Sequence, residues 1–204
     1  MTDAAASAAI TIRPATDADL PAMCALYNHY IENTPATFDV EPYSLESYRK
    51  DWFSRYAPVG PHRVLVAEAG GEILGLTYSS PYKPKAAYGI TVESSVYCAP
   101  GQTRRGLGLR LYSALFQALQ EEDLTQTVGL IALPNDPSEK LHQRCGFRRV
   151  GVLERVGRKF GREWDVAIWQ RPLRARSTSR AIWEPFPALV SMRRAARPIR
   201  SIHS

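Results

Sequence analysis

Arginine, glycine and leucine residues cluster over Arg104 to Leu109, directly before a run of apolar residues at helical spacing. The first turn of a helix presents unpaired backbone N–H groups and partial positive charge. Gly106 and Gly108 let a ligand come close to that backbone, and Arg104 and Arg105 add full charges. The segment therefore suits a pyrophosphate, although such a segment taken alone is more often a solvated helix start. It lacks both the GK[ST] of a Walker loop and the GxGxxG of dinucleotide sites.

A strand and a helix must position this segment. Thr91 to Tyr97 is an alternating run of β-branched and aromatic residues, which predicts a strand. Leu107, Leu111, Leu115 and Ala118 fall on one helical face, so we expect the helix to pack on the sheet by that side. The first turn of the helix would then lie at the end of the strand.

The rest of the chain predicts further elements around the same sheet. Asp17 or Asp19 can cap the first helix, which has Pro21 in its first turn, and Ser44 can cap the second. We expect a strand and helix in 11–31, a helix in 44–56, a hairpin in 63–82, a strand in 125–136, a short helix in 137–147 and strands in 148–157 and 164–170. In the second helix, Leu45, Tyr48 and Trp52 should share one face. This order predicts an α+β, or mixed α/β, fold around one sheet.

Composition separates a body from a tail. The chain has 204 residues, 45% of them apolar, which is typical of a globular domain. Seven of the 26 basic side chains and only one of the 20 acidic ones lie in residues 174–204, so residues 1–173 carry equal numbers of both. We interpret 1–173 as the domain and the Arg-rich 174–204 as a disordered or loosely docked tail, with an RNA-binding arm as the alternative.

Several classes of protein are excluded or disfavoured by the sequence. No stretch has the ~18 apolar residues of a membrane span, and the first nine residues lack the features of a signal peptide. Cys24, Cys98 and Cys145 form neither an even set nor a CxxC metal spacing, which is typical of a reducing compartment. We therefore expect a cytoplasmic protein without a metal site.

The segment that begins with the strand Thr91 to Tyr97 and continues through RRGLG into the helix resembles the acetyl-CoA motif of the GNAT superfamily of N-acetyltransferases. Within it, the segments NHYIENTPATF, YKPKAAY, TVESSVYC, LPNDPSEKLHQRCGF and WDVAIWQ resemble the phosphinothricin N-acetyltransferase branch over roughly Ile10 to Pro172. The resemblance implies a GNAT-like fold, with a mostly antiparallel central sheet, a splayed central strand pair and flanking helices. Thr103 departs from the pattern, since the motif usually has Gln or Arg there.

The resemblance implies a binding site for acetyl-CoA. The splayed strand would pair with the pantetheine amides, and the glycine loop would hold the pyrophosphate. Asn135 would hydrogen-bond the pantetheine arm, although a plain turn and helix cap is its local alternative. The residues implied to contact acetyl-CoA are Val96, Tyr97, Cys98, Arg104, Arg105, Gly106, Leu107, Gly108, Leu109 and Asn135.

Glu93 and His142 are the candidate catalytic residues. An α-ammonium group must lose a proton before it attacks a thioester, and the Glu93 carboxylate can accept that proton. Glu93 and Ser95 share the Tyr97 face of the strand and Ser94 lies on the other, although Glu93 could also be a solvated edge residue. His142 takes the place of the superfamily's proton-donating tyrosine, with donation and substrate orientation both open. Tyr112 is a second candidate for that proton and otherwise a core residue.

Substrate recognition is implied at the remaining positions. Lys83 and Lys85 would attract the anionic groups of an amino-acid analogue, or be solvated loop residues. The residues implied to contact substrate are Phe38, Lys83, Lys85, Glu93, Ser94, Ser95 and Val166. Cys98 is interpreted as a packing residue and not as a nucleophile. The amine would attack directly within a ternary complex.

We therefore predict a cytoplasmic N-acetyltransferase acting on the α-amine of phosphinothricin or of methionine sulfoximine or sulfone. Members of the branch commonly form homodimers. The alternatives are an acetyltransferase of another amine, such as a polyamine or a peptide N-terminus, and a non-catalytic acyl-CoA-binding module with a nucleic-acid-binding tail. The two lysines count against a cationic polyamine, since like charges repel.

Overall fold

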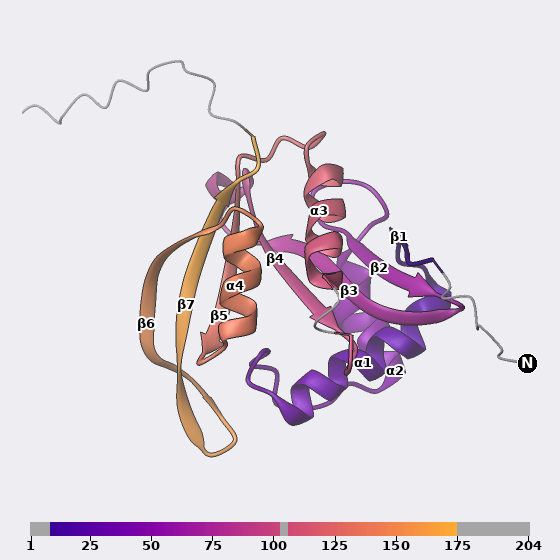
Figure 1. The fold of residues 1–204 in the computed structure, drawn as a ribbon, viewed down its shortest axis with the longest axis horizontal. Helices are drawn as coiled ribbons and strands as arrows, with labels where there is room; N and C mark the ends of the chain where they lie inside the picture. The colour runs from indigo at the N-terminus through magenta and orange to yellow at the C-terminus, as the bar shows by residue number, and fades with distance from the viewer. Residues whose placement is uncertain (1–8, 103–105, 175–204) are drawn as a thin grey trace, which may run out of the picture.

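The computed structural model describes residues 9–102 and 106–174 (Figure 1). The expected contacts of Thr103, Arg104, Arg105 and the tail lie outside these residues. The strands are β1 Thr11–Pro14, β2 Val64–Ala69, β3 Glu72–Pro81, β4 Thr91–Cys98, β5 Gln126–Leu133, β6 Arg148–Lys159 and β7 Arg162–Pro172. The α-helices are α1 Leu20–Asn33, α2 Leu45–Ser47, α3 Leu107–Leu119 and α4 Asp136–Arg144. No helix among the described residues is long and apolar enough to cross a membrane.

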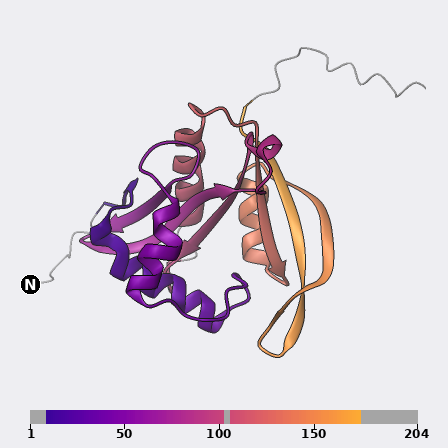
Figure 2. The same ribbon diagram turned by 180° about the vertical axis from the view of Figure 1, so that it is seen from behind.

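One seven-stranded sheet organises the domain. Its order is β1-β2-β3-β4-β5-β7-β6, and every neighbouring pair is antiparallel except β4 and β5, which are parallel. Helices α3 and α4 cover one face and α1 and α2 the other, as opposite views show (Figures 1 and 2). The predicted mixed α/β fold with a mostly antiparallel sheet is confirmed.

The central strands separate partway along their length. The β4–β5 ladder has three pairs, from Thr91↔Gln126 to Glu93↔Val128. Beyond Glu93, β4 stays paired with β3 and β5 stays paired with β7, so the two strands diverge. Glu93 lies at the vertex of the opening, and the expected splay is present.

Two apolar layers hold the sheet between the helices. On one face, aromatic residues of α1 and of the segment after α2 pack against β3 and β4, with Tyr27, Tyr48 and Trp52 at the centre. On the other face, the predicted apolar side of α3 packs against the sheet, and Leu111 and Leu115 are fully buried. The alternation along β4 is as predicted, because Tyr97 belongs to the α1 layer whereas Ser94 bonds to residues of the α3 side.

The prediction of one regular helix over 44–56 is wrong, because the segment combines three kinds of helical turn. Ser44 does cap α2, since its Oγ accepts a hydrogen bond from the Ser47 N–H at 3.1 Å. The chain then continues as a π-helical stretch, Tyr48–Trp52, and a 3₁₀ turn, Phe53–Arg55. Tyr48 and Trp52 stack with ring centroids 4.7 Å apart, while Leu45 is exposed. Aromatic packing under the sheet therefore decides the local helix geometry, which periodicity alone does not reveal.

Asp19 also differs from its expected role. The carboxylate makes no cap to α1 and instead accepts hydrogen bonds from Arg13 Nη1 at 2.7 Å and from the Thr16 N–H at 2.8 Å. These bonds, chiefly the one from Arg13, lower the pKa of this buried carboxyl from 3.8 to about 2. The ion pair joins β1 to the start of α1.

Replacing Asp19 by Asn should lower the free energy of unfolding at pH 7 by about 2 kcal/mol. Because the folded pKa lies below the unfolded one, this stabilisation is present above pH ~4 and is lost as the pH falls toward 2. Urea denaturation at pH 7 and at pH 2.5 measures the difference. Asp17→Asn is the matched control, since the Asp17–Arg49 pair is exposed and should contribute under ~0.5 kcal/mol. An equal loss at both pH values would contradict the assignment.

Candidate active site

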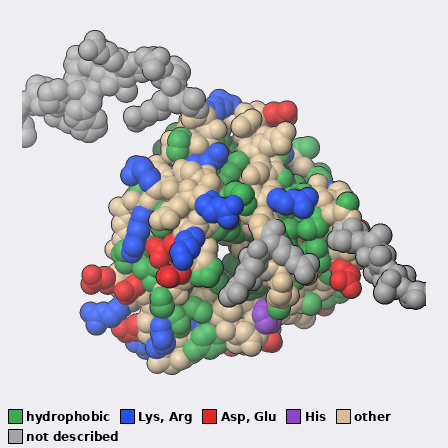
Figure 3. Space-filling model, viewed as in Figure 1, with side chains coloured by type: hydrophobic (Ala, Val, Ile, Leu, Met, Phe, Trp, Pro, Cys, Tyr) green, Lys and Arg blue, Asp and Glu red, His purple; other side chains and the backbone are tan. Residues whose placement is uncertain are grey.

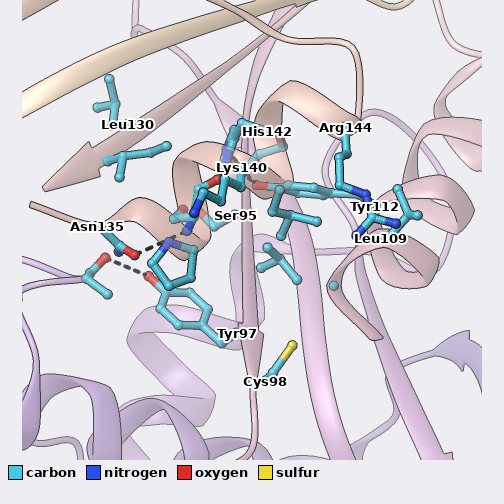
Figure 4. A pocket seen from close by; sticks show the side chains of 18 of the residues that line it. Ser95, Tyr97, Cys98, Leu109, Tyr112, Leu130, Asn135, Lys140, His142 and Arg144 are labelled. Carbon is cyan, nitrogen blue, oxygen red and sulfur yellow. Dashed lines mark hydrogen bonds between the residues drawn. The ribbon is translucent and has the colours of Figure 1, made fainter. Parts of the chain in front are cut away.

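A cavity of about 440 Å³ opens where β4 and β5 diverge. Its walls come from β4, β5, α4 and the first turn of α3, with the end of α1 at one side (Figure 4). Figure 3 shows this face hollowed near its centre, with Lys and Arg side chains gathered around the hollow. Of the residues expected to form the site, the cavity is lined by Ser94, Ser95, Val96, Tyr97, Cys98, Gly106, Gly108, Leu109, Asn135 and His142.

The backbone of β4 offers hydrogen-bonding groups to this cavity. The Ala99 N–H donates to the Leu74 carbonyl of β3, so in the alternating pattern of an antiparallel ladder Ser95 and Tyr97 also bond to β3. Ser94, Val96 and Cys98 then direct their N–H and C=O groups toward the opening. The even-numbered residues of β5 face it from the other side, because the Gln126 N–H points to Ile90 of the β4 side. The cleft can therefore accept an extended ligand as an additional strand.

Two of these β4 residues already have partners. The Tyr30 hydroxyl donates to the Cys98 carbonyl at 2.7 Å and accepts from the Cys98 N–H at 3.3 Å. The Ser94 carbonyl accepts a hydrogen bond from the Tyr112 hydroxyl at 3.2 Å. Val96, between them, has no such partner in the described part of the chain, so its amide groups are open to a ligand.

Two glycines shape the start of α3, and Gly108 does so for helix packing and not for the predicted approach of a ligand. Gly106 caps the helix with φ 72°, a conformation that side chains rarely adopt, and open space lies where its Cβ would be. A Cβ on Gly108 would lie 2.8 Å from Leu141 Cδ2, so Gly108 lets α3 approach α4. The bare helix N-terminus thus faces the cavity between these two helices. Leu107 packs in the core and contributes only backbone to this turn.

Asn135 is the N-cap of α4 and also a residue of the cavity wall. Its Oδ1 accepts a hydrogen bond from the Ser138 N–H at 3.2 Å and so caps α4, while the residue also lines the cavity. The cap fixes the side chain on the cavity wall.

His142 and Tyr112 form a buried pair. His142 Nδ1 lies 2.8 Å from the Ser138 carbonyl oxygen, which can only accept, so Nδ1 carries a proton. Burial lowers the pKa of His142, so the ring is neutral and Nε2, 3.3 Å from the Tyr112 hydroxyl, bears a lone pair. Burial also raises the pKa of Tyr112, which keeps its proton. Of this pair, Tyr112 is the group with a proton to donate.

Gly129 makes room for this arrangement. A Cβ at Gly129 would lie 2.6 Å from His142 Nε2, closer than side chains tolerate. The absence of a side chain on β5 thus allows the imidazole to reach Tyr112.

Glu93 lies at the vertex of the opening and is not part of the cavity lining. Its side chain faces the α1 layer, on the same side of β4 as Tyr97. Burial raises the pKa of the carboxyl, and the positive charge of Lys83 opposes that rise. A carboxyl with a raised pKa at the edge of a cavity is suited to proton transfer.

The other residues expected at the substrate lie around this point. Lys83 and Lys85 are exposed on the loop after β3, Phe38 packs on Gly157 of β6, and Val166 is buried on β7. None of these four lines the cavity among the described residues.

Sequence patterns missed ten residues of the lining, and four of them bear on its shape or charge. Tyr30 and Ala36 come from the end of α1 and the loop after it, and Lys140 and Arg144 lie one turn apart on α4. The i, i+4 spacing of the two basic residues was a readable signal for a positively charged helix face. Tyr30 could not be found this way, because its partner Cys98 is 68 residues away.

Known proteins resemble this chain over nearly its whole described length. The sequence profile of the Acetyltransferase (GNAT) family matches residues 23–147. A phosphinothricin N-acetyltransferase of Streptomyces coelicolor is 48% identical over 169 residues, covering 82% of this chain and 98% of that protein. An L-methionine sulfoximine/L-methionine sulfone acetyltransferase of Pseudomonas aeruginosa is 36% identical over 160 residues, covering 78% and 92%. The crystal structure of a phosphinothricin acetyltransferase from Sinorhizobium meliloti in complex with acetyl-CoA has a TM-score of 0.74 at 29% identity, covering 80% and 88%.

Proposed function

Since the chain belongs to the acetyltransferase (GNAT) family and is an acetyl-CoA-dependent N-acetyltransferase, we propose an acceptor for the acetyl group. The acceptor is the α-amine of a small amino-acid analogue, which reacts in the β4–β5 cleft with Glu93 as the base. Phosphinothricin and methionine sulfoximine or sulfone are the proposed substrates. The observation that carries the proposal is the position of Glu93 at the vertex of the cleft, directly before Ser94 of the cavity lining, together with the burial that raises the pKa of its carboxyl.

The donor fits the cleft by the chemistry of the residues present. Val96 offers open backbone groups to the pantetheine amides, and the N–H groups at the start of α3 suit the pyrophosphate. Lys140 and Arg144 supply positive charge to the phosphates from the α4 wall. Bound there, acetyl-CoA supplies an activated acetyl group. Its carbonyl oxygen gains negative charge during attack, which an N–H of β4 can stabilise.

The acceptor reaches the cleft from the α1 side of β4. Glu93 takes the proton of the ammonium group, either directly or through a water, so that the amine can attack. Lys83 and Lys85 attract the anionic groups of the acceptor. Tyr112 has one hydroxyl proton, which the structure directs toward the Ser94 carbonyl or His142 Nε2, and this proton turns to the departing sulfur during the reaction.

Replacing Gly106 by Val should raise the KM for acetyl-CoA about tenfold or more and leave the acceptor KM nearly unchanged, because the side chain enters the open space before α3. Gly71→Val is the matched control. Gly71 also has positive φ and an open Cβ position, but lies in the β2–β3 turn. Steady-state kinetics measures both constants, and calorimetry measures the affinity for CoA. Equal effects of the two variants would show that backbone strain alone is responsible.

A panel of amines tests the proposed function. The purified protein is incubated with acetyl-CoA and, one at a time, phosphinothricin, methionine sulfoximine, methionine sulfone, spermidine and a short peptide, while free CoA thiol is followed. Release of thiol with the first three amines alone supports the proposal. Release with spermidine or peptide alone would assign another amine as acceptor. If no amine causes release of thiol although CoA still binds, the non-catalytic binding module would be favoured.

We also propose a cytoplasmic homodimer. The three free cysteines suit a reducing compartment. Strand β6 forms one edge of the sheet and is exposed over most of its length, with Val150, Val152, Leu153 and Val156 between 39% and 54% exposed. Such an edge suits pairing with a second copy. Sedimentation of the wild type and of Val152→Lys tests the dimer, since a charge at this edge should favour the monomer.

The domain boundary is proposed close to residue 173. Leu173 is buried in the α3 layer and Arg174 contacts Glu122 and Asp123, so the catalytic domain is proposed to include both residues. Deleting 175–204 should change kcat and both KM values by less than about twofold, because the basic tail is not part of the proposed site. A large loss would assign the tail a catalytic role.

A further inference from the structure

The β6–β7 hairpin is bonded to the loop between α1 and α2. Lys159, the last residue of β6, is only 4% exposed, and its Nζ donates a hydrogen bond to the Thr37 carbonyl at 2.7 Å. The turn that follows, Phe160-Gly161, has positive φ at both residues, which folds the hairpin tightly. Both ribbon views show the hairpin tip at the same end of the molecule as α1 (Figures 1 and 2). A contact across 122 positions thus joins two separate segments.

The buried lysine is held firmly in this position. A lysine is seldom buried without a partner. Burial lowers the pKa of Lys159, and the negative charge of Asp39 opposes this change. Trp164 Nε1 donates to the Lys159 carbonyl at 2.9 Å, and the Arg162 guanidinium lies 3.6 Å from the centre of the Trp164 ring. The hairpin therefore presents Lys159 in one orientation.

A second contact joins the same two segments. The Phe38 ring lies directly on Gly157 of β6, so closely that a Cβ at this position would be 2.1 Å from the ring. Only a glycine allows the ring to lie there. Gly157 therefore provides the space that the Phe38 ring occupies.

The loop also borders the cavity. Ala36 lines it, and the Ala36 carbonyl accepts a weak hydrogen bond from the Tyr97 hydroxyl at 3.5 Å. On the other side of the loop, the Tyr27 hydroxyl donates to the Asp39 carboxylate at 2.8 Å. Movement of the loop would therefore change the cavity on the α1 side of β4, which is the side proposed for the acceptor.

We propose that the β6–β7 hairpin fixes residues 36–39 beside the acceptor, and that Lys159 and Gly157 are positioning residues that determine which amino-acid side chain fits. The inference rests on the proposed function, because it uses the acceptor side assigned there. Neither residue lines the cavity, and the loop borders it at Ala36, on the α1 side of β4 and opposite the face covered by α3, so changes at both should affect the acceptor more than acetyl-CoA.

Lys159→Met removes the donor and keeps an apolar side chain of similar length. The KM for phosphinothricin or methionine sulfone should rise about tenfold, on the usual contribution of a hydrogen bond from a charged group, while the KM for acetyl-CoA changes less than twofold. Lys159→Arg, which keeps a charged donor, should restore most of the acceptor KM. Parallel increases in both KM values, or no change in either, would overturn the proposal.

Gly157→Ala tests the second contact without removing a charge. The displaced Phe38 ring should change the ratio of kcat/KM between phosphinothricin and methionine sulfone by about threefold or more. Gly151→Ala, on the same strand with open space around it, should leave the ratio unchanged. An unchanged ratio in Gly157→Ala, or the same change in both variants, would contradict the role of Gly157.

Hydrogen exchange separates this inference from the proposed function. Amide exchange of a peptide covering 34–43 should be at least about fivefold faster in Lys159→Met than in the wild type, whatever the acceptor. If exchange is faster in the variant but the wild type acetylates no amino-acid analogue, the proposed function and the role in acceptor binding are overturned. The contact between Lys159 and the loop would still be supported. Unchanged exchange would overturn the positioning by Lys159 even in an active enzyme.

Discussion

Replacing Glu93 by Gln should lower kcat about 100-fold or more while acetyl-CoA still binds with unchanged affinity. Glutamine keeps the size of the side chain and its place at the vertex of the cleft but cannot accept the proton of the ammonium group. Kinetics with phosphinothricin or methionine sulfone measures turnover, and calorimetry measures binding of acetyl-CoA.

The pH profile makes this prediction specific. Since burial raises the pKa of Glu93, the wild type should lose activity on acidification at a pH above the usual range of a glutamate, as the base becomes protonated. The residual activity of Glu93→Gln should lack that acidic limb. An intact limb in the variant would assign the titration to another group and remove Glu93 from the mechanism.

Stability provides the control for folding. The raised folded pKa means that ionised Glu93 destabilises the native state, and this cost develops as the pH rises through the folded pKa. Glu93→Gln should therefore be at least as stable as the wild type at pH 7. Loss of turnover in a protein of equal or greater stability identifies a catalytic effect, whereas loss of both would indicate misfolding.

Replacing Tyr112 by Phe should lower kcat about 10- to 100-fold with little change in the KM for acetyl-CoA. The variant keeps the ring that stacks on Phe116 but loses the hydroxyl between the Ser94 carbonyl and His142 Nε2. Since Nδ1 of His142 is committed to the Ser138 carbonyl, no other group of the pair has a proton for the departing sulfur.

Tyr48→Phe is the matched control for Tyr112→Phe. The Tyr48 hydroxyl is buried and has no hydrogen-bond partner among the described residues, so its removal should not affect turnover and should not lower stability. If Tyr112→Phe kept full activity and His142→Gln lost it, His142 would be the proton donor and the assignment of the two residues would be reversed.

Local patterns predicted the parts of the site that lie on regular elements. The alternation along β4 placed Glu93 on the face of Tyr97, and the helical spacing of α3 placed its first turn at the end of that strand. Glycines mark positions where the backbone itself is needed, so Gly106 and Gly108 were readable from the sequence. The resemblance to a family added roles that no local pattern carried, as for Asn135.

Other features depend on contacts between distant segments. Tyr30 meets Cys98 and Lys159 meets Thr37 across 68 and 122 positions, and neither pair has a sequence signal. The preference for Tyr112 over His142 as hydrogen-bond donor depends on which nitrogen faces the Ser138 carbonyl, and that follows only from geometry. The broken helix after Ser44 reflects packing of Tyr48 and Trp52 that outweighs helical propensity.

The short β4–β5 ladder has a consequence for the lifetime of the protein. Along the sheet, the β1–β4 half and the β5–β7 half are joined by three residue pairs, and elsewhere they depend on the layer beneath α3 and on the contacts of the β6–β7 hairpin with the loop after α1. A ligand that fills the cleft completes the interrupted sheet and binds the folded chain alone, so its concentration adds to the stability. Resistance of the purified protein to proteases should therefore increase with the concentration of acetyl-CoA.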